Sequence, residues 1–208
     1  MKKKRKRRWF GPSKAEIWKQ FSEGIGGEFY VEKKTLSKIE KVYAYHKKWE
    51  ICLDTFVVST GNSHVSYTRF RAAYLFRDDF TFRIVRRNFF RDIGKRFGLE
   101  DLEVGHQQFD HDFIIQGTDQ KKCEMLFDNP RLRELISGRQ KHIEIKTEDG
   151  EGVFKNDYPD GINVLTFTAL GVIKDLDRLY EIYDLFAEIL DQLYEIGTAE
   201  EDAPNFGF

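Results

Sequence analysis

The sequence predicts an α+β fold in which helices pack on one face of an antiparallel, meandering sheet. Two observations predict it. Between about residues 38 and 87, apolar residues recur with a period of two in four runs separated by short turns, a pattern typical of antiparallel strands. After Asp175, a suitable N-cap, apolar residues instead follow helical spacing to about Ile196, with Gly197 next. We therefore expect a long C-terminal helix.

The composition predicts one folded domain with two charged ends. Hydrophobic residues make up 40% of the 208 residues and aromatic residues 15%, enough to build a core. We expect a mobile basic arm over residues 1–11, a single globular α+β domain over residues 12–197 and a flexible acidic tail over residues 198–208. No run of 18 apolar residues is present, so we expect no transmembrane segment.

Local signals predict the individual elements. Ser13 and Glu16 have the spacing of a capping box at the start of a helix that Gly24 ends. Strands follow at residues 38–46, 49–58, 65–76 and 80–87. The later elements are a helix at 88–97, a strand at 113–116, a helix capped by Thr118 or Asp119, a helix beginning at Asn129-Pro130, a strand at 142–147 and the longest strand at 162–173.

The charge of the chain is divided between its halves. Residues 1–100 contain 24 Lys and Arg against 11 Asp and Glu, whereas residues 101–208 contain 10 against 24. Such asymmetry points to contact with a polyanion or a membrane, or to charge-guided association between chains. It identifies no reaction.

Much of the positive excess lies in seven consecutive basic residues at the N-terminus. These are Lys2, Lys3, Lys4, Arg5, Lys6, Arg7 and Arg8. The arm could bind nucleic acid, act as a nuclear-import signal, or lie on anionic lipid with Trp9 and Phe10 entering the interface. The alternative is a solubilising extension with no specific partner.

A second basic region lies on the predicted strands. Between His64 and Gly98 the chain contains nine Lys and Arg residues but only three Asp residues, and aromatic residues are interspersed among the basic ones. The basic residues are Arg69, Arg71, Arg77, Arg83, Arg86, Arg87, Arg91, Lys95 and Arg96. They could follow a phosphate backbone while the aromatic residues stack on bases. Alternatively, the aromatic residues form the core and the basic residues form the outer face.

The C-terminal helix carries the main acidic pattern. Five carboxylates recur at spacings of three and four and therefore share one helix face. They are Glu181, Asp184, Glu188, Asp191 and Glu195. This stripe is either a solvated surface or a docking surface for something basic.

The residues suited to acid–base chemistry are Asp110, His111 and Asp112, with His106 nearby. If this segment is a strand, the two aspartates point away from His111. No Gly-x-Ser-x-Gly, His-Glu-x-x-His or phosphate-binding glycine loop is present, and no pair of Glu-x-x-His motifs lies on the predicted helices. The two cysteines, Cys52 and Cys123, have no metal-site spacing. We expect no catalytic residue, no metal and no cofactor.

Part of the chain resembles an uncharacterised bacterial domain-of-unknown-function family. The resemblance lies in residues 101–105, in the Phe109-to-Asp119 segment with its Gly117 turn, and in residues 126–136, and it extends over about residues 49–147. These motifs are structural and imply no catalytic residue. Some members contain hydrophobic membrane segments, which this chain lacks. If Gly117 has a positive φ, a side chain there would be costly.

The sequence therefore favours a non-enzymatic binding or interaction module, either for a protein partner or for a second copy, guided by charge. The alternative is a polyanion binder that contacts nucleic acid or an anionic membrane surface through the arm and the Arg-rich strands. An enzyme centred on residues 106–112 is the third hypothesis. We expect a cytoplasmic location, with the membrane surface as the peripheral alternative.

Overall fold

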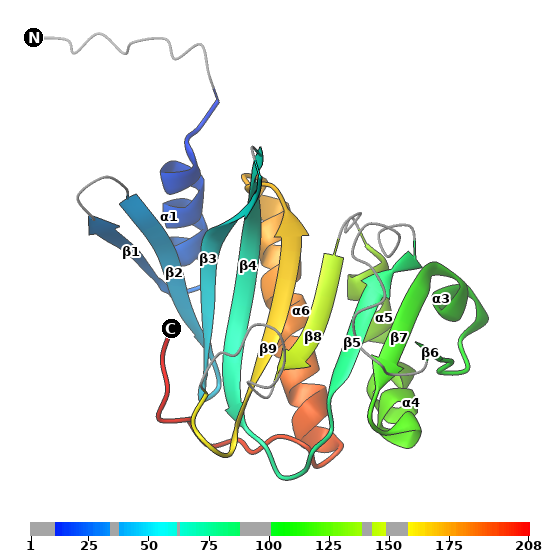
Figure 1. Ribbon diagram of the computed structural model, residues 1–208. Helices are drawn as coiled ribbons and strands as arrows, with labels where there is room; N and C mark the ends of the chain where they lie inside the picture. Colours follow the sequence, from blue (N-terminus) through cyan, green and yellow to red (C-terminus); the bar gives the residue numbers. More distant parts are fainter. Residues whose placement is uncertain (1–10, 34–37, 62, 88–100, 139–142, 149–157) are drawn as a thin grey trace, which may run out of the picture.

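A computed structural model describes residues 11–33, 38–61, 63–87, 101–138, 143–148 and 158–208 (Figure 1). Nine strands form one sheet in the order β1-β2-β3-β4-β9-β8-β5-β7-β6, and every neighbouring pair is antiparallel. The strands are β1 (Glu28–Lys33), β2 (Lys38–His46), β3 (Trp49–Thr60), β4 (Ser63–Leu75), β5 (Phe82–Arg86), β6 (Asp101–Leu102), β7 (Phe113–Gly117), β8 (Ile143–Glu148) and β9 (Ile162–Leu170). The described helices are α1 (Lys14–Gly24), α3 (Gln107–Asp112), α4 (Gln120–Asp128), α5 (Pro130–Ser137) and α6 (Leu176–Glu195).

The helices cover one face of the sheet, which confirms the predicted α+β class. In Figure 1 the helices α1, α6, α5 and α4 lie behind the strands. The core lies between the two layers, where Phe70 of β4 contacts the rings of Phe21 in α1, Phe167 in β9 and Phe186 in α6. The opposite side of the sheet, which we call the open face, carries none of the described helices.

The predicted helix caps are confirmed. The side chain of Ser13 accepts a hydrogen bond from the backbone N–H of Glu16, and Glu16 accepts one from the backbone N–H of Ser13. Asp119, Asn129 and Asp175 likewise accept from backbone N–H groups in the first turns of α4, α5 and α6. Each cap satisfies N–H groups that have no partner inside the helix.

The strand order is less local than the sequence pattern indicated. The strands β1 to β4 form a continuous meander, but β9 and β8 lie between β4 and the next strand along the chain, β5. The longest strand is β4, with 13 residues, whereas β9 ends at Leu170 and has nine. The helix predicted at residues 88–97 lies outside the described residues.

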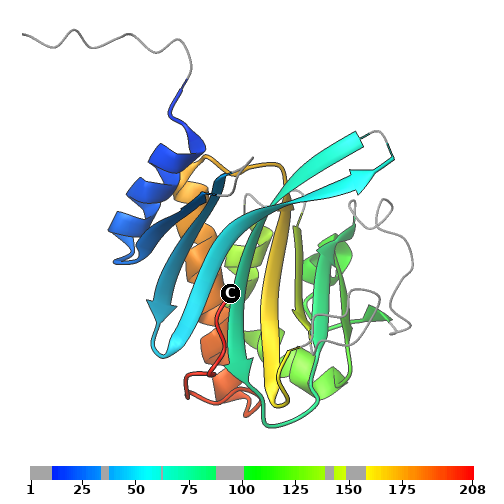
Figure 2. The same cartoon turned by 60° about the vertical axis from the view of Figure 1, so that its left-hand side comes forward.

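The C-terminal segment, expected to be loose, packs against the rest of the chain. Thr198 and Ala199 are buried, Ala199 forms a bridge with Phe76, and the backbone N–H of Glu200 donates to the carbonyl of Leu75. The chain then turns onto the open face, where Phe208 lies against Arg71, and Figure 2 shows its end over the strands β3 and β4. Phe206 and Phe208 bury apolar surface against the sheet. This burial favours an ordered segment, although its acidic residues led us to expect a flexible one.

Gly117 is required by close packing and not by a positive φ. A Cβ at this position would lie 2.5 Å from Sγ of Cys123 and 3.2 Å from the carbonyl oxygen of Thr81. We predict that Gly117→Ala lowers the free energy of unfolding by about 1–3 kcal/mol, measured by urea titration. Cys123→Ala introduced with it should recover most of the loss. An unchanged loss in the double variant would show that Cys123 is not the cause.

Candidate binding surface

The open face carries a row of polar side chains that crosses five strands. Cys52 in β3 lies opposite Arg71 in β4, Arg71 opposite Thr166 in β9, Thr166 opposite Lys146 in β8, and Lys146 opposite Arg83 in β5. Directly opposed residues share a face, so all five point away from the helix layer. The row therefore places three cations and a hydroxyl at neighbouring-strand spacing.

A buried carboxylate organises the charges beside this row. Asp54 is 4% exposed and accepts hydrogen bonds from Nε and Nη2 of Arg69, at 2.9 and 2.7 Å, and from Nη2 of Arg71, at 2.7 Å. Burial alone would raise the pKa of Asp54, but the hydrogen bond from Arg69 and the positive charges of Arg71 and Arg69 lower it below the ordinary value. Asp54 is therefore ionised at neutral pH.

Other side chains in and beside the row also form polar contacts, but two buried polar atoms of the row have no hydrogen-bond partner among the described residues. Nε of Arg83 donates to Glu144 at 2.7 Å, and the amide of Gln116, which lies opposite Arg83 on β7, donates to Asp101 at 3.1 Å. Nε of Arg71 and the hydroxyl oxygen of Thr166 are buried and have no hydrogen-bond partner within the described residues. This row is consequently polar but incompletely satisfied, in contrast to the aromatic core on the other side of the sheet.

The upper part of β3 and β4 forms a two-stranded ribbon, residues 55–68, that extends beyond the sheet (Figure 2). These fourteen residues contain no Asp, Glu, Lys or Arg, although a third of the chain is charged. Val57 and Val58 are 57% and 39% exposed. Phe56 and Tyr67 stack with ring centroids 5.2 Å apart, and the guanidinium of Arg69 lies 4.9 Å from the Phe56 centroid.

The outer edge of the ribbon has no strand beside it among the described residues. The register of β2 with β3 runs from His46–Trp49 to Val42–Leu53, so β3 continues beyond Leu53 without a described neighbour on that side. On the other side, the register of β9 with β4 ends at Ala169–Thr68, after which Gly171 forms one bridge to Tyr67 and donates its N–H to the carbonyl of Ser66. An isolated pair of strands is marginally stable in water, so an exposed, uncharged ribbon with an unpaired edge is typical of a surface that contacts another chain.

The Arg-rich strands do not present a row of unpaired cations. Arg69 and Arg71 bind Asp54, Arg83 binds Glu144, and Arg77 lies 3.4 Å from Glu200. Arg86 donates to the carbonyl of Ser137, and Arg87 donates to the carbonyls of His111, Asp110 and Phe113. Arg91, Lys95, Arg96 and the basic arm over residues 2–8 lie outside the described residues. The aromatic residues Phe70, Phe80 and Phe82 are buried in the core.

The acidic stripe of α6 is partly engaged by the chain itself. Asp191 lies 2.8 Å from both Nε2 of His46 and Nζ of Lys47, and Glu188 accepts from the amide of Asn129 at 2.6 Å. Glu181 is half-buried, whereas Asp184 and Glu195 are exposed. The stripe therefore offers less free carboxylate than its spacing indicated.

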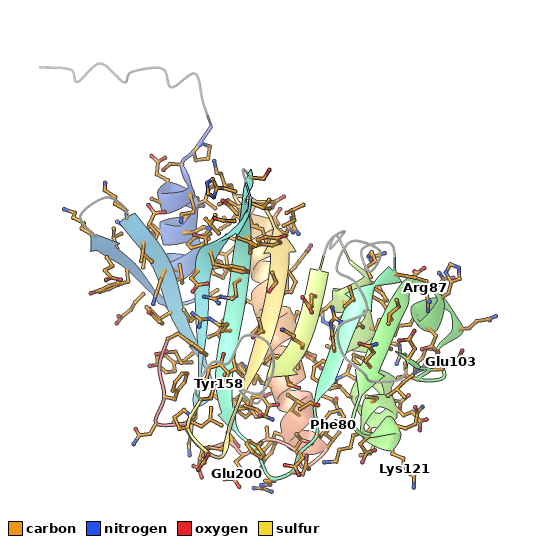
Figure 3. All side chains as sticks on the ribbon, viewed as in Figure 1. Phe80, Arg87, Glu103, Lys121, Tyr158 and Glu200 are labelled. Atoms are coloured by element: carbon orange, nitrogen blue, oxygen red, sulfur yellow. The ribbon has the colours of Figure 1, made fainter. Side chains whose placement is uncertain are left out.

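Residues 110–112 belong to helix α3 and not to a strand, so the condition under which both aspartates would point away from His111 is not met. The carboxylate of Asp110 accepts from the backbone N–H groups of Val104 and His106, which fixes the turn that starts the helix. His106 contacts Arg133 at 2.8 Å and lines a hollow between α3 and α5. His111 is mostly exposed and lines a different hollow with Arg87 and Glu103, which lie at the α3 end of the molecule (Figure 3). The two imidazoles therefore do not converge.

The remaining candidate groups also lack a reactive arrangement. Burial raises the pKa of the Cys52 thiol to about 11 and that of the Cys123 thiol to about 12, so both are protonated at neutral pH. Across the described ranges, no group of three or more His, Cys, Asp or Glu side chains is placed to hold a metal ion. In the same ranges, no helix has the length and apolar character needed to cross a bilayer.

No protein-family model, curated protein or solved structure matches this chain. The resemblance of residues 49–147 to a bacterial family therefore stays a prediction. The ribbon is the feature that sequence reasoning missed. Its signal was the charge-free run between Asp54 and Arg69.

Proposed function

We propose that this chain is a protein-interaction module that associates with a second copy of itself through the ribbon, residues 55–68. The observation that carries the proposal is the uncharged, exposed ribbon with an unpartnered β3 edge among the described strands. Unpaired backbone N–H and C=O groups along such an edge can pair with another extended strand.

The lack of charge favours a second copy as the partner. In a twofold pair the same residues approach one another, so a self-pairing strand must not bring like charges together. The ribbon meets this condition. The edge strand β1 does not, because antiparallel self-pairing centred on Tyr30 would place Glu28 opposite Glu32 of the other copy.

The charged side chains nearest to the ribbon lie at its base, where it joins the sheet, and not at its centre. Asp54, Arg69 and Arg71 lie where the uncharged ribbon joins the sheet. Depletion of charged residues at the centre, with polar residues at the rim, is the usual composition of a protein–protein interface. The hypothesis of charge-guided association is in this way narrowed to an uncharged contact with a charged rim.

The alternatives have less support. Six of the nine basic residues of the Arg-rich region bind groups within the chain, which lowers the number available for a polyanion. Binding of nucleic acid or anionic lipid by residues 2–8 stays a prediction. An enzyme centred on residues 106–112 is disfavoured because His106 and His111 line separate hollows.

Sedimentation velocity of the full chain over roughly 10–500 μM tests the proposal. The wild type should form dimers, and Val57→Lys combined with Val58→Lys should raise the dimer dissociation constant by at least about tenfold, because like charges would then face each other. Tyr30→Lys, on the 58% exposed Tyr30 of β1, is the matched control and should leave the dimer unchanged.

The salt dependence of dimer formation distinguishes pairing through the ribbon from an electrostatic contact between the basic arm, residues 2–8, and the acidic stripe of α6. Attraction between residues 2–8 and the carboxylates of α6 would weaken steeply as salt rises, whereas pairing of the uncharged ribbon would not. A monomer at all concentrations, or a dimer that survives Val57→Lys with Val58→Lys, would overturn the proposal.

A further inference from the structure

A second, smaller hydrophobic cluster lies on the open face, at the opposite end of β4 from the ribbon. Its floor is made by Ala73 in β4 and by Ile162 and Val164 in β9, which are 3%, 5% and 0% exposed. Aromatic side chains pack over this floor. They are Tyr158, Phe206 and Phe208.

The C-terminal segment, residues 203–208, contacts this cluster through two phenylalanines. The guanidinium of Arg71 lies 4.0 Å from the ring centroid of Phe208, and the hydroxyl of Tyr43 donates to the Phe208 carbonyl at 2.5 Å. The ring of Phe206 meets Tyr158 edge-on, with centroids 5.6 Å apart, and meets Phe208 edge-on at 5.3 Å. Both rings are half-buried.

The segment is held as a bound peptide would be and not as part of the sheet. Residues 203–208 belong to neither a helix nor a strand. A hollow remains between this segment and the sheet, lined on the sheet side by Tyr45, Lys48, Glu50 and Ala73. Before it, Lys48 pairs with Asp202 at 3.1 Å on the exposed surface. The segment is therefore held on the sheet mainly by the side chains of Phe206 and Phe208 and by their contacts with Arg71 and Tyr43.

We propose that Tyr43, Arg71, Ala73, Tyr158 and Val164 form a binding site for a peptide with two aromatic residues separated by one residue, and that Phe206-Gly207-Phe208 is its internal occupant. Phe208 takes the place beside Arg71, where a cation can lie over the face of an aromatic ring. Phe206 takes the place beside Tyr158. The proposal does not depend on self-association through the ribbon, which lies at the other end of β4.

An internal occupant competes with any external peptide. A segment tethered a few residues from its site has an effective concentration in the millimolar range, so an external peptide must overcome that concentration to bind. The site should therefore be nearly closed to external peptides in the wild type and accessible once the two phenylalanines are removed.

The test is a titration of the full chain with a synthetic, fluorescently labelled Pro-Asn-Phe-Gly-Phe peptide, followed by anisotropy. Phe206→Ala with Phe208→Ala should bind this peptide at least about tenfold more tightly than the wild type. A peptide with alanine in place of both phenylalanines should not bind. Arg71→Leu in the emptied variant should weaken binding about fivefold or more, because the contact with the ring is lost.

The emptied variant must remain folded, which far-UV circular dichroism establishes. If the double variant unfolds, Phe208→Ala alone is used, because it vacates the place beside Arg71 while Phe206 still holds the segment. If a folded, emptied variant binds the two peptides equally or binds neither, the proposal fails. That result would not bear on the proposed ribbon dimer, because sedimentation velocity tests the dimer separately.

Discussion

Replacing Asp54 with alanine is expected to lower the free energy of unfolding by about 3–5 kcal/mol, the largest effect of any polar substitution on the open face. The loss arises because two guanidinium groups, those of Arg69 and Arg71, would be left without the carboxylate that joins them. Urea unfolding at neutral pH measures it. Arg69→Met is the matched control, since it keeps the Asp54–Arg71 pair, and we expect it to cost less, about 1–3 kcal/mol.

The loss of stability caused by Asp54→Ala is expected to depend on pH. The pKa of Asp54 is lower in the folded chain than its ordinary value of 3.8. A group of this kind contributes stability that is fully present above its unfolded pKa and is lost as pH falls through the folded pKa. The difference between wild type and Asp54→Ala should therefore be constant at neutral pH and shrink below about pH 4. A difference that grows on acidification would contradict the assignment of Asp54 as the ionised centre.

Trp18→Ala is expected to cost about 3–5 kcal/mol, the range for removing a large buried aromatic side chain. Trp18 is fully buried in α1, its indole N–H donates to the carbonyl of Ile173 at 3.0 Å, and Nζ of Lys14 lies 4.5 Å from its ring centroid. The side chain thus joins the first helix to the segment between β9 and α6. Chemical unfolding followed by circular dichroism provides the measurement.

Trp18→Phe separates packing from the hydrogen bond. Phenylalanine keeps most of the apolar contact but leaves the Ile173 carbonyl without its donor, so we expect a loss of about 1–3 kcal/mol. Equal losses for the two variants would mean that the hydrogen bond, and not the cavity, dominates. A loss below about 1 kcal/mol for Trp18→Ala would mean that α1 contributes little to the folded state.

Features governed by neighbours in the sequence were predictable. The capping box of Ser13 and Glu16, the Asn129-Pro130 start of α5 and the cap at Asp175 each depend on contacts within four residues. In the predicted strand at residues 80–87, a period of two also puts Phe82 and Ile84 on the face opposite to Arg83, and the structure buries both of them in the core.

Features governed by distant contacts were not predictable in this way. Nothing in residues 82–86 specifies β8 as a partner, because a period of two fixes the face of a strand but not its neighbour. The packing of Phe206 depends on Tyr158 and Val164, and the need for glycine at 117 depends on Cys123. The α3 helix was missed because Asp110 bonds to backbone N–H groups behind it, which alternation does not reveal.

The position of β9 beside β4 has a consequence for the newly made chain. Ala72 pairs with Leu165, so the inner edge of the N-terminal meander has no partner until the ribosome has added more than ninety further residues. At about 5–20 residues per second, this takes roughly 5–20 seconds. During that interval β4 exposes an unpaired strand edge beside the uncharged residues 55–68. Nascent chains on one messenger are therefore most prone to join one another before β9 emerges, and a chaperone that covers β4 would protect them.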